Sequence, residues 1–329
     1  MKMTIVKGIE SDEVKHRTDE IKSAILLNDP IEDKLNVVMV ISNPCEYQKR
    51  WELAKAFISH MEDNDHVNLY IAEMAYEGQT FHVTDSDNPM HLQMRTQIPL
   101  WCKESLIDAA INQLLPSDWK AVAWIDADVE FGHPEWARDT LKVLNGSKDV
   151  VQLFSHCLDM DKNENTMNVF TSFGYQYATG KKYCGRGCNF WHPGFGWAMT
   201  RKAYIRLGFI FYWSILGAAD HQMAFAFIGK SSSIHANSSD GYKKKIVELV
   251  KKSRNLRLGY VPGVIRHFWH GSKQNRKYME RWQILIKYNY DPFIHVKLNE
   301  EGIIVPTDEC PKDMLCDIMK YFQERREDD

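Results

Sequence analysis

The stretch Ala121-Val-Ala-Trp-Ile-Asp-Ala-Asp128 decides the fold, because an apolar run of strand-forming residues ends abruptly in two carboxylates. On an extended strand, residues i and i+2 point to the same side, so Asp126 and Asp128 would face one point. Hard divalent cations such as Mg²⁺ and Mn²⁺ prefer oxygen ligands of this kind. The stretch therefore predicts a buried strand with a metal–diphosphate site at the edge of an α/β sheet. The alternative is a solvated strand end that closes in a turn.

The composition is that of a globular protein, with 44% hydrophobic and 26% charged residues among 329. A formal net charge of −3 gives no general attraction to nucleic acid, although a local basic patch could still bind it. The first residues lack the apolar core of a signal peptide, and the most apolar window, 207–219, is too short to span a membrane. We therefore expect a cytoplasmic protein without membrane insertion.

Seven scattered cysteines are typical of reduced thiols. Cys184, Cys188 and His192 have a spacing that suits zinc, but no fourth ligand lies nearby in the sequence, so free thiols are favoured.

Strand and helix patterns alternate over the first 155 residues and predict a mainly parallel sheet with helices on both faces. The sequence contains neither of the two glycine-rich phosphate-binding motifs, which argues against a dehydrogenase or a P-loop enzyme. The first predicted strand begins at Leu35, and the others cover 67–72, 81–84, 121–125 and 150–154. The first predicted helix carries Trp51 to Met61, the second spans 101–114 and the third starts at Pro134.

We predict four segments along the chain. They are an N-terminal extension, 1–34, with a short helix over Asp12–Leu27; a nucleotide-binding half, 35–155; a more irregular acceptor half, 156–295; and a tail with an amphipathic helix, 296–329.

A single carboxylate, Asp220, follows an aromatic and glycine-rich loop and stands at the expected start of a helix. Such a group can act as a general base if desolvation offsets the helix dipole, which favours its ionised form. The alternative is a simple helix cap.

The segment Tyr260–Arg276 supplies His267 and His270, followed by Lys273 and Arg276. Neutral imidazole binds Mn²⁺ or Zn²⁺, and lysine and arginine bind a diphosphate. The alternative is a pair of structural histidines in an aromatic loop.

Polar side chains also follow the first two predicted strands, at the sheet edge where α/β proteins bind nucleotides. They are Ser42, Asn43 and Glu73, and Lys103 lies close enough in the sequence to reach the same crevice.

Five segments within 36–295 resemble nucleotide-sugar glycosyltransferases of the GT-A type, family-two-like, and in particular uncharacterised members from bacteriophages and large viruses. The segments are Trp101-Cys-Lys-Glu, Trp124-Ile-Asp-Ala-Asp, His192-Pro-Gly-Phe-Gly-Trp-Ala, Gly259-Tyr-Val-Pro-Gly and His270-Gly-Ser-x-x-Asn-Arg-x-Tyr.

The resemblance implies a Rossmann-like GT-A fold, a Mn²⁺ or Mg²⁺ ion and a nucleotide-sugar donor, with a UDP-sugar favoured. It implies metal ligands Asp126, Asp128, His267 and His270; donor contacts from Ser42, Asn43, Glu73, Lys103, Asp126, Lys273 and Arg276; Asp220 as the base of an inverting transfer; and acceptor contacts from His192, Trp197 and His221. Two departures are Ala219 before Asp220, where the family has a second acid, and Glu73 in place of aspartate.

Alternatives remain open. A nucleotidyl or phosphoryl transferase would use the same acids with further ones nearby, such as Asp159, Asp161 or Glu130. A binding module on a transferase fold would lack activity, and retention of stereochemistry is not excluded. The acceptor would be a glycan or a hydroxymethylated base in phage DNA in a host cytoplasm; a basic helix over Lys243–Arg257 is the candidate DNA contact.

Overall fold

The computed structural model describes residues 29–185, 190–231, 237–278 and 280–329. The predicted helix over Asp12–Leu27 and the thiol of Cys188 lie outside the described residues.

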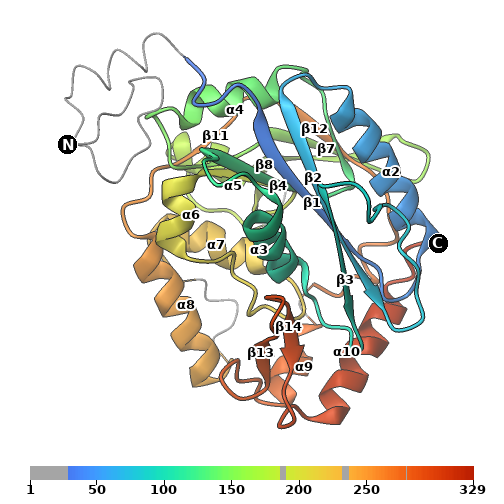
Figure 1. The fold of residues 1–329 in the computed structure, drawn as a ribbon. Coiled ribbons are helices and arrows are strands. Elements are labelled where there is room, and N and C mark those ends of the chain that lie inside the picture. Colours follow the sequence, from blue (N-terminus) through green and yellow to red (C-terminus); the bar gives the residue numbers. More distant parts are fainter. Residues whose placement is uncertain (1–28, 186–189, 232–236, 279) are drawn as a thin grey trace.

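A seven-stranded sheet forms the centre of the molecule, in the order β11-β6-β10-β4-β1-β2-β3 (Figure 1). Its neighbouring strands are parallel, except that β10 is antiparallel to both β4 and β6. The mixed, mainly parallel sheet that the alternating pattern predicts is therefore confirmed. The strands are β1 (Leu35–Ser42), β2 (Val67–Tyr76), β3 (His91–Thr96), β4 (Ala121–Ile125), β6 (Val150–Gln152), β10 (Gly196–Thr200) and β11 (Leu258–Tyr260).

Helices cover both faces of this sheet because its strands are apolar on both sides. Along β1, Val37 and Met39 belong to one buried cluster, whereas Val38 belongs to the other. The first cluster packs against α2 (Gln48–Glu62) and α4 (Trp136–Leu144). The second packs against α3 (Lys103–Leu114), α6 (Arg201–Leu207), α7 (Ala219–Phe227) and α8 (Asp240–Ser253).

A second, five-stranded sheet, β5-β12-β7-β8-β9, organises the region predicted to be irregular. Its strands are β5 (Val129–Phe131), β7 (His156–Met160), β8 (Thr166–Ser172), β9 (Trp191–His192) and β12 (Val264–His267), and α5 (Phe173–Ala178) follows β8. The later half of the chain also places β10 between β4 and β6 of the main sheet. The two predicted halves on either side of residue 155 therefore contribute strands to the same sheet.

The predicted strand over 81–84 is wrong, because these residues form a loop and β3 begins at His91. The backbone N–H groups of His82, Val83 and Thr84 donate to the Glu73 carboxylate at 2.7–3.0 Å rather than to a neighbouring strand. No helix in the described ranges is long and apolar enough to span a bilayer.

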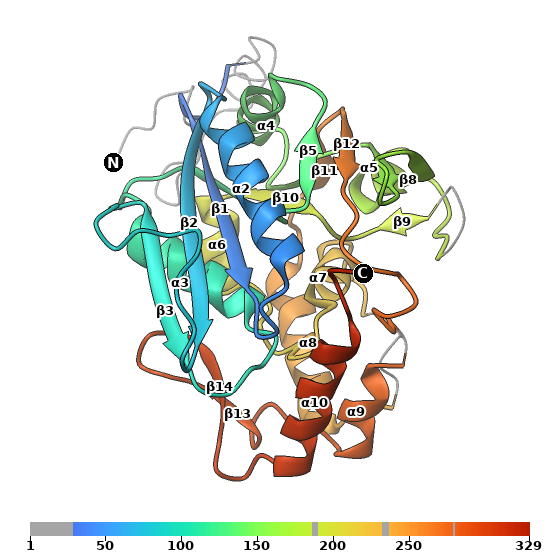
Figure 2. The ribbon, with the colours of Figure 1, turned by 90° about the vertical axis from the view of Figure 1, so that its right-hand side faces the viewer.

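The predicted amphipathic helix of the tail is α10 (Lys312–Glu324), which buries Met314, Ile318 and Phe322 in the main core. It lies beside α9 (Trp282–Lys287) and near the hairpin of β13 (Val296–Leu298) and β14 (Ile304–Pro306) (Figure 1). Beyond α10 the chain runs toward the segment that follows β12 (Figure 2), and the Trp269 indole N–H donates to the Asp329 carbonyl at 3.2 Å.

Candidate active site

Asp126 and Asp128 lie in a turn between β4 and β5, because β4 ends at Ile125. The expectation that both acids extend one face of a strand is therefore corrected. The turn is held from two sides: the Asp126 N–H donates to the Phe195 carbonyl at 2.7 Å, and the Phe268 N–H donates to the Asp128 carbonyl at 2.8 Å. Because the chain turns between them, the two carboxylates meet different partners.

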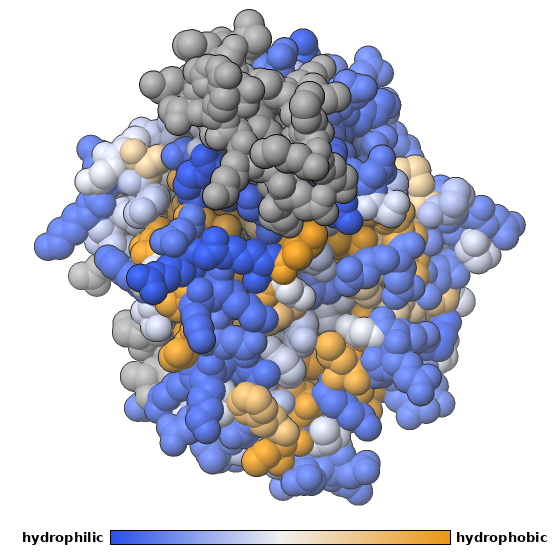
Figure 3. Space-filling view, turned by 60° about the vertical axis from the view of Figure 1, so that its left-hand side comes forward, coloured by the Kyte–Doolittle hydropathy of each residue, from blue (hydrophilic) through white to orange (hydrophobic). Residues whose placement is uncertain are grey.

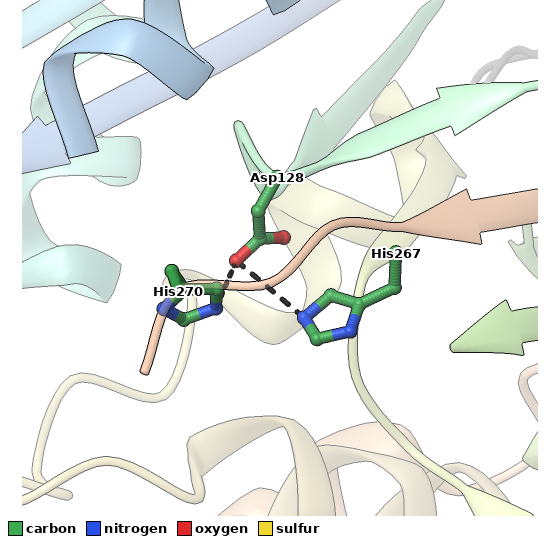
Figure 4. A group of neighbouring side chains, drawn as sticks. All are labelled: Asp128, His267 and His270. Atoms are coloured by element: carbon green, nitrogen blue, oxygen red, sulfur yellow. Dashed lines mark ion pairs between the residues drawn. The ribbon is translucent and has the colours of Figure 1, made fainter. Parts of the chain in front are cut away.

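Asp128 converges with both predicted histidines (Figure 4). Its Oδ2 lies 2.7 Å from Nε2 of His270 and 3.8 Å from Nε2 of His267. The candidate ligand atoms of the three residues all lie within 4.8 Å of one another. Both imidazoles are buried, at the end of β12 and in the loop after it. The predicted meeting of Asp128 with the 267–270 segment is thus observed.

A second carboxylate stands behind each of these imidazoles. The His267 Nδ1 lies 2.8 Å from Asp159 Oδ1, and the His270 Nδ1 lies 3.7 Å from Glu327 Oε2. The hydrogen bond to Asp159 favours the proton on Nδ1 of His267 and leaves its Nε2 lone pair on the side of Asp128, whereas Nδ1 of His270 is buried without a hydrogen-bond partner among the described residues. This arrangement of acid, imidazole and inward nitrogen is the one that metal-binding histidines commonly adopt.

The contacts of His270 fit a bound cation. Its Nε2 lies 2.7 Å from the Asp128 carboxylate and also 2.7 Å from Nη2 of Arg276. A guanidinium only donates and a carboxylate only accepts, so one ring nitrogen cannot satisfy both neighbours. The other oxygen of Asp128 is buried without a hydrogen-bond partner among the described residues. Two imidazole nitrogens and a carboxylate oxygen form a donor set that suits Mn²⁺ or Zn²⁺.

Asp126 does not belong to this group, since its carboxylate forms an ion pair with the ammonium of Lys103 at the start of α3. The prediction that Asp126 is also a metal ligand is corrected accordingly. Burial raises the pKa of Asp126, against the opposing charge of Lys103. Burial acts in the same sense on Asp128, but His270, His267 and Arg276 outweigh it and lower the pKa of that carboxyl. The two acids therefore have opposite electrostatic environments.

A cavity opens at the end of β1, lined by the last residues of that strand, by the residues that lead into α3 and by the segment at the end of α10. The chain leaves β1 toward β2 on one side and returns to β4 on the other, and such a switch point is where open α/β sheets bind ligands. Ser42, Asn43 and Lys103 line the cavity, as do Arg50 and Trp101. The predicted residues are thus brought together at one opening.

Glu73 is the exception among the predicted nucleoside contacts. It lies at the sheet edge, but it is only 3% exposed. Besides the three N–H groups of the 82–84 loop, its carboxylate accepts the hydroxyl proton of Thr84 at 2.7 Å. Because these four bonds occupy it, Glu73 holds the loop in place, and we leave it out of the donor contacts.

Lys273 and Arg276 surround the histidines rather than a free opening. The Lys273 ammonium pairs with Asp159, which also contacts His267. Arg276 is 8% exposed and donates to the Tyr278 hydroxyl at 2.9 Å as well as approaching His270. Both cations therefore stand next to the candidate metal ligands.

Asp220 lies in the first turn of α7, after a sharp bend in which Gly217 and Ala218 both have positive φ. One carboxylate oxygen accepts the N–H of His221 at 2.8 Å. The other lies so close to Gly194 that a Cβ on that residue would stand 2.9 Å from it. The charge of Asp220 also contributes to the raised pKa values of Lys103 and Asp126.

The three predicted acceptor residues lie in different environments. His192 stacks between Phe170 and Phe195, with ring centroids 4.7 and 4.3 Å away, and burial lowers its pKa to about 3, which keeps it neutral. His221 is half-buried beside Phe225. Trp197 is 1% exposed in the core, and its indole N–H donates to the Pro193 carbonyl, so the prediction that it contacts an acceptor is wrong.

Sequence reasoning missed Glu327, Arg50 and the contact of Asp159 with His267. Arg50 lies on α2 and forms a bidentate ion pair with Glu327, which follows α10. Asp159 is 108 residues from His267 in the sequence. No local motif marks such contacts, because each joins segments that only the folded chain brings together.

Comparisons with known proteins show little. No family model matches the chain, and no curated protein sequence matches it. Among solved structures, the catalytic domain of Drosophila β1,4-galactosyltransferase 7, crystallised with xylobiose, is similar at a TM-score of 0.38 and 8% identity. The alignment covers 87% of this chain and 99% of that one. A likeness at this level supports no conclusion about the activity of this chain.

Proposed function

We propose that this protein is a metal-dependent glycosyltransferase of the GT-A type, which moves a sugar from a nucleotide diphosphate sugar to an acceptor hydroxyl. The observations that carry the proposal are the convergence of Asp128, His267 and His270 and a cavity at the end of β1, the strand that lies between β4 and β2 in the sheet. A cation held by these residues would stand at the opening where an α/β sheet binds a nucleotide. Mn²⁺ suits the nitrogen-rich donor set, with Mg²⁺ as the alternative.

The donor would lie in the cavity lined by Ser42 and Trp101, with its diphosphate toward Lys103 and the acid turn. Lys103 is held at Asp126 and supplies a positive charge at the point where the leaving diphosphate becomes more negative. When bound, the divalent cation would offset the same developing charge as a Lewis acid. A UDP-sugar is the first donor to test.

Asp220 would remove the proton from the acceptor hydroxyl. Asp220 is partly exposed, and its charge contributes to the raised pKa values of Lys103 and Asp126, which supports a place near the acid turn. A base that faces the sugar from the side opposite the diphosphate would give in-line attack and inversion. Asp220 is the only acid in the first turn of α7, so this role rests on one residue.

Aromatic rings near Asp220 favour a glycan as the acceptor. The ring of Tyr183 is 45% exposed and packs on Phe225, which in turn contacts His221. Exposed aromatic rings bind the apolar faces of sugars, since they bury area without leaving polar groups unpaired. Tyr183 therefore supplies a platform within reach of the proposed base.

The basic helix α8 gives no specific support for a DNA acceptor. Lys243 pairs with Asp240, and Lys252 pairs with Glu248. The lysine at 245 lies 4.2 Å from the ring centroids of Trp213 and Phe293. These three lysines of α8 therefore have partners within the fold, on a face where hydrophilic side chains are interrupted by smaller apolar areas (Figure 3).

A nucleotidyl or phosphoryl transferase that uses two metals is not favoured. Asp159 comes close to the site, but His267 and Lys273 occupy its oxygens. In the part of the chain that the structure describes, the 128–267–270 group is the one set of side chains arranged to hold an ion. Two-metal chemistry would need a second such set about 4 Å away.

The test is hydrolysis of a panel of nucleotide sugars with Mn²⁺, with Mg²⁺ and with a chelator. We expect slow, metal-dependent hydrolysis of at least one donor, abolished in Asp128→Asn. Asp161→Asn is the matched control, since this exposed aspartate lies near the site in sequence but bonds only within its own loop. Metal-independent hydrolysis, or equal activity in Asp128→Asn, would refute the proposal.

A further inference from the structure

Glu327, which follows α10, enters the candidate metal site from the opposite end of the sequence. Its side chain is 1% exposed, and Oε2 lies 3.7 Å from Nδ1 of His270. On the other side of the group, Asp159 is closer to its histidine and forms a hydrogen bond with Nδ1 of His267 at 2.8 Å. We propose that Glu327 is a positioning residue, which orients His270 and so sets the metal affinity of the site; this rests on the proposed function.

The approach of Glu327 requires a glycine directly after His270. Gly271 has a φ of +85°, and a Cβ there would stand 3.0 Å from the Cα of Glu327 and 3.1 Å from the Arg326 carbonyl. A side chain at this position would push the two segments apart. The backbone after His270 is therefore shaped to let this segment pack against it.

The segment is also anchored on both sides of Glu327. The Asp328 carboxylate accepts the N–H groups of Gln48 and Lys49 at 3.1 and 2.8 Å, at the start of α2. The Tyr47 hydroxyl accepts the Arg326 N–H at 3.0 Å. These bonds hold residues 326–328 to α2, so the position of Glu327 does not depend on its contact with His270.

Two arginines fix the direction of the Glu327 carboxylate. Arg50 binds it with two nitrogens, and Nη2 of Arg325 donates to Oε1 at 2.6 Å. These two cations fix the orientation of the carboxylate beside His270. Nδ1 of His270 is buried without a hydrogen-bond partner among the described residues, so a carboxylate held 3.7 Å away would favour the proton on that nitrogen and leave the Nε2 lone pair free for a cation.

The competing explanation is that Glu327 only neutralises the two buried arginines. That role would affect stability, because removal of the acid leaves like charges unpaired in the interior. It would leave the metal affinity of the folded protein unchanged. Mn²⁺ affinity and thermal stability, measured together on the full chain, separate the two roles.

The experiment titrates Mn²⁺ into folded protein and follows free ion by electron paramagnetic resonance, with Tm measured on each variant. We expect Glu327→Gln to weaken Mn²⁺ binding by about 10–100-fold, as for other carboxylates that support a metal-bound histidine. Asp159→Asn should have a comparable effect through His267. Asp317→Asn is the matched control: this acid lies on α10 and pairs with Lys287 of α9, so its loss should change the Kd by less than about threefold.

The variants distinguish the proposed metal site from the proposed role of Glu327. Wild-type binding that His270→Ala abolishes supports the metal site itself, and absence of that binding overturns both proposals. A wild-type Kd in Glu327→Gln, or an equal loss in Asp317→Asn, overturns the positioning role alone. If Glu327→Gln is too unstable to titrate, Glu327→Asp takes its place, because it keeps the charge but moves it one methylene away from His270. An unchanged Mn²⁺ affinity in Glu327→Asp overturns the positioning role.

Discussion

The two carboxylates of the acid turn stand two residues apart and face different parts of the molecule. Asp126 faces the first turn of α3 and is paired with Lys103. Asp128 faces the loop after β12, where it meets His267 and His270. Lys103 therefore balances the charge of Asp126 in an ion pair, whereas the surroundings of Asp128 are those of the proposed metal site. An Asp-x-Asp pair thus need not supply two equivalent ligands, because the tertiary partners of each acid decide its role.

Replacement of Asp128 gives the largest expected effect. Asp128→Asn should reduce both donor hydrolysis and transfer by about 10³-fold or more, because the several kcal/mol of charge stabilisation from the cation would be lost. Steady-state rates and Mn²⁺ titration on the same preparation check this. Asp126→Asn should retain Mn²⁺ binding within about tenfold. If both variants lose the ion equally, the division of roles between the two acids is wrong.

Replacement of Asp220 should separate the base from the metal. Asp220→Asn is expected to slow transfer by about 10²-fold or more, which is the usual contribution of a general base. Mn²⁺ affinity should not change, since Asp220 lies outside the 128–267–270 group. Measurement of transfer with the preferred acceptor, beside the Mn²⁺ Kd, decides. A parallel loss of metal binding would contradict the assignment.

Replacement of Lys103 tests the other side of the comparison. Lys103→Met removes the charge that balances Asp126, and we expect a loss of about 10- to 100-fold in kcat/KM with the metal site intact. Arg138→Met is the control, since this side chain is 48% exposed on α4 and pairs only with Glu135. Donor kinetics equal to wild type in Lys103→Met would remove this residue from the diphosphate contacts.

The smallest expected effect concerns stability and pH. Burial raises the pKa of Glu104, the neighbour of Lys103, from 4.5 to about 8, and one of its oxygens has no hydrogen-bond partner among the described residues. The folded state therefore holds this proton more tightly than the unfolded state. The contribution of this bound proton to the free energy of unfolding is complete below pH 4.5 and is lost as the pH rises toward 8.

Glu104→Gln cannot ionise, so its free energy of unfolding relative to wild type should rise between pH 5 and 9, by on the order of 1–3 kcal/mol. Urea unfolding at both pH values measures the difference. Glu248→Gln, on the exposed face of α8, should show no such trend. A constant difference between Glu104→Gln and wild type at the two pH values would show that the carboxyl is ionised in the folded protein.

Much of the main sheet was predictable, because buried strands and amphipathic helices show a regular spacing of apolar residues in the sequence. The apolar run from Leu35 became β1, and the face of Trp51, Ala54, Phe57 and Met61 became the buried side of α2. The loop at 81–84 was mistaken for a strand, since a distant acid, Glu73, takes the hydrogen bonds that a strand would use. Trp197 was assigned to the acceptor because sequence shows that a ring is present, not whether it is buried.

By itself the sequence determined that a strand ends in two acids and that two histidines follow a late strand, because these features depend on neighbours along the chain. Only the tertiary structure decided which acid meets the histidines, that Asp159 and Glu327 stand behind them, and that Lys103 takes Asp126. Each of these choices joins residues tens to hundreds of positions apart. A turn of the backbone between β4 and β5 separates the two carboxylates, and only the packing of the two sheets and α3 around that turn assigns a partner to each.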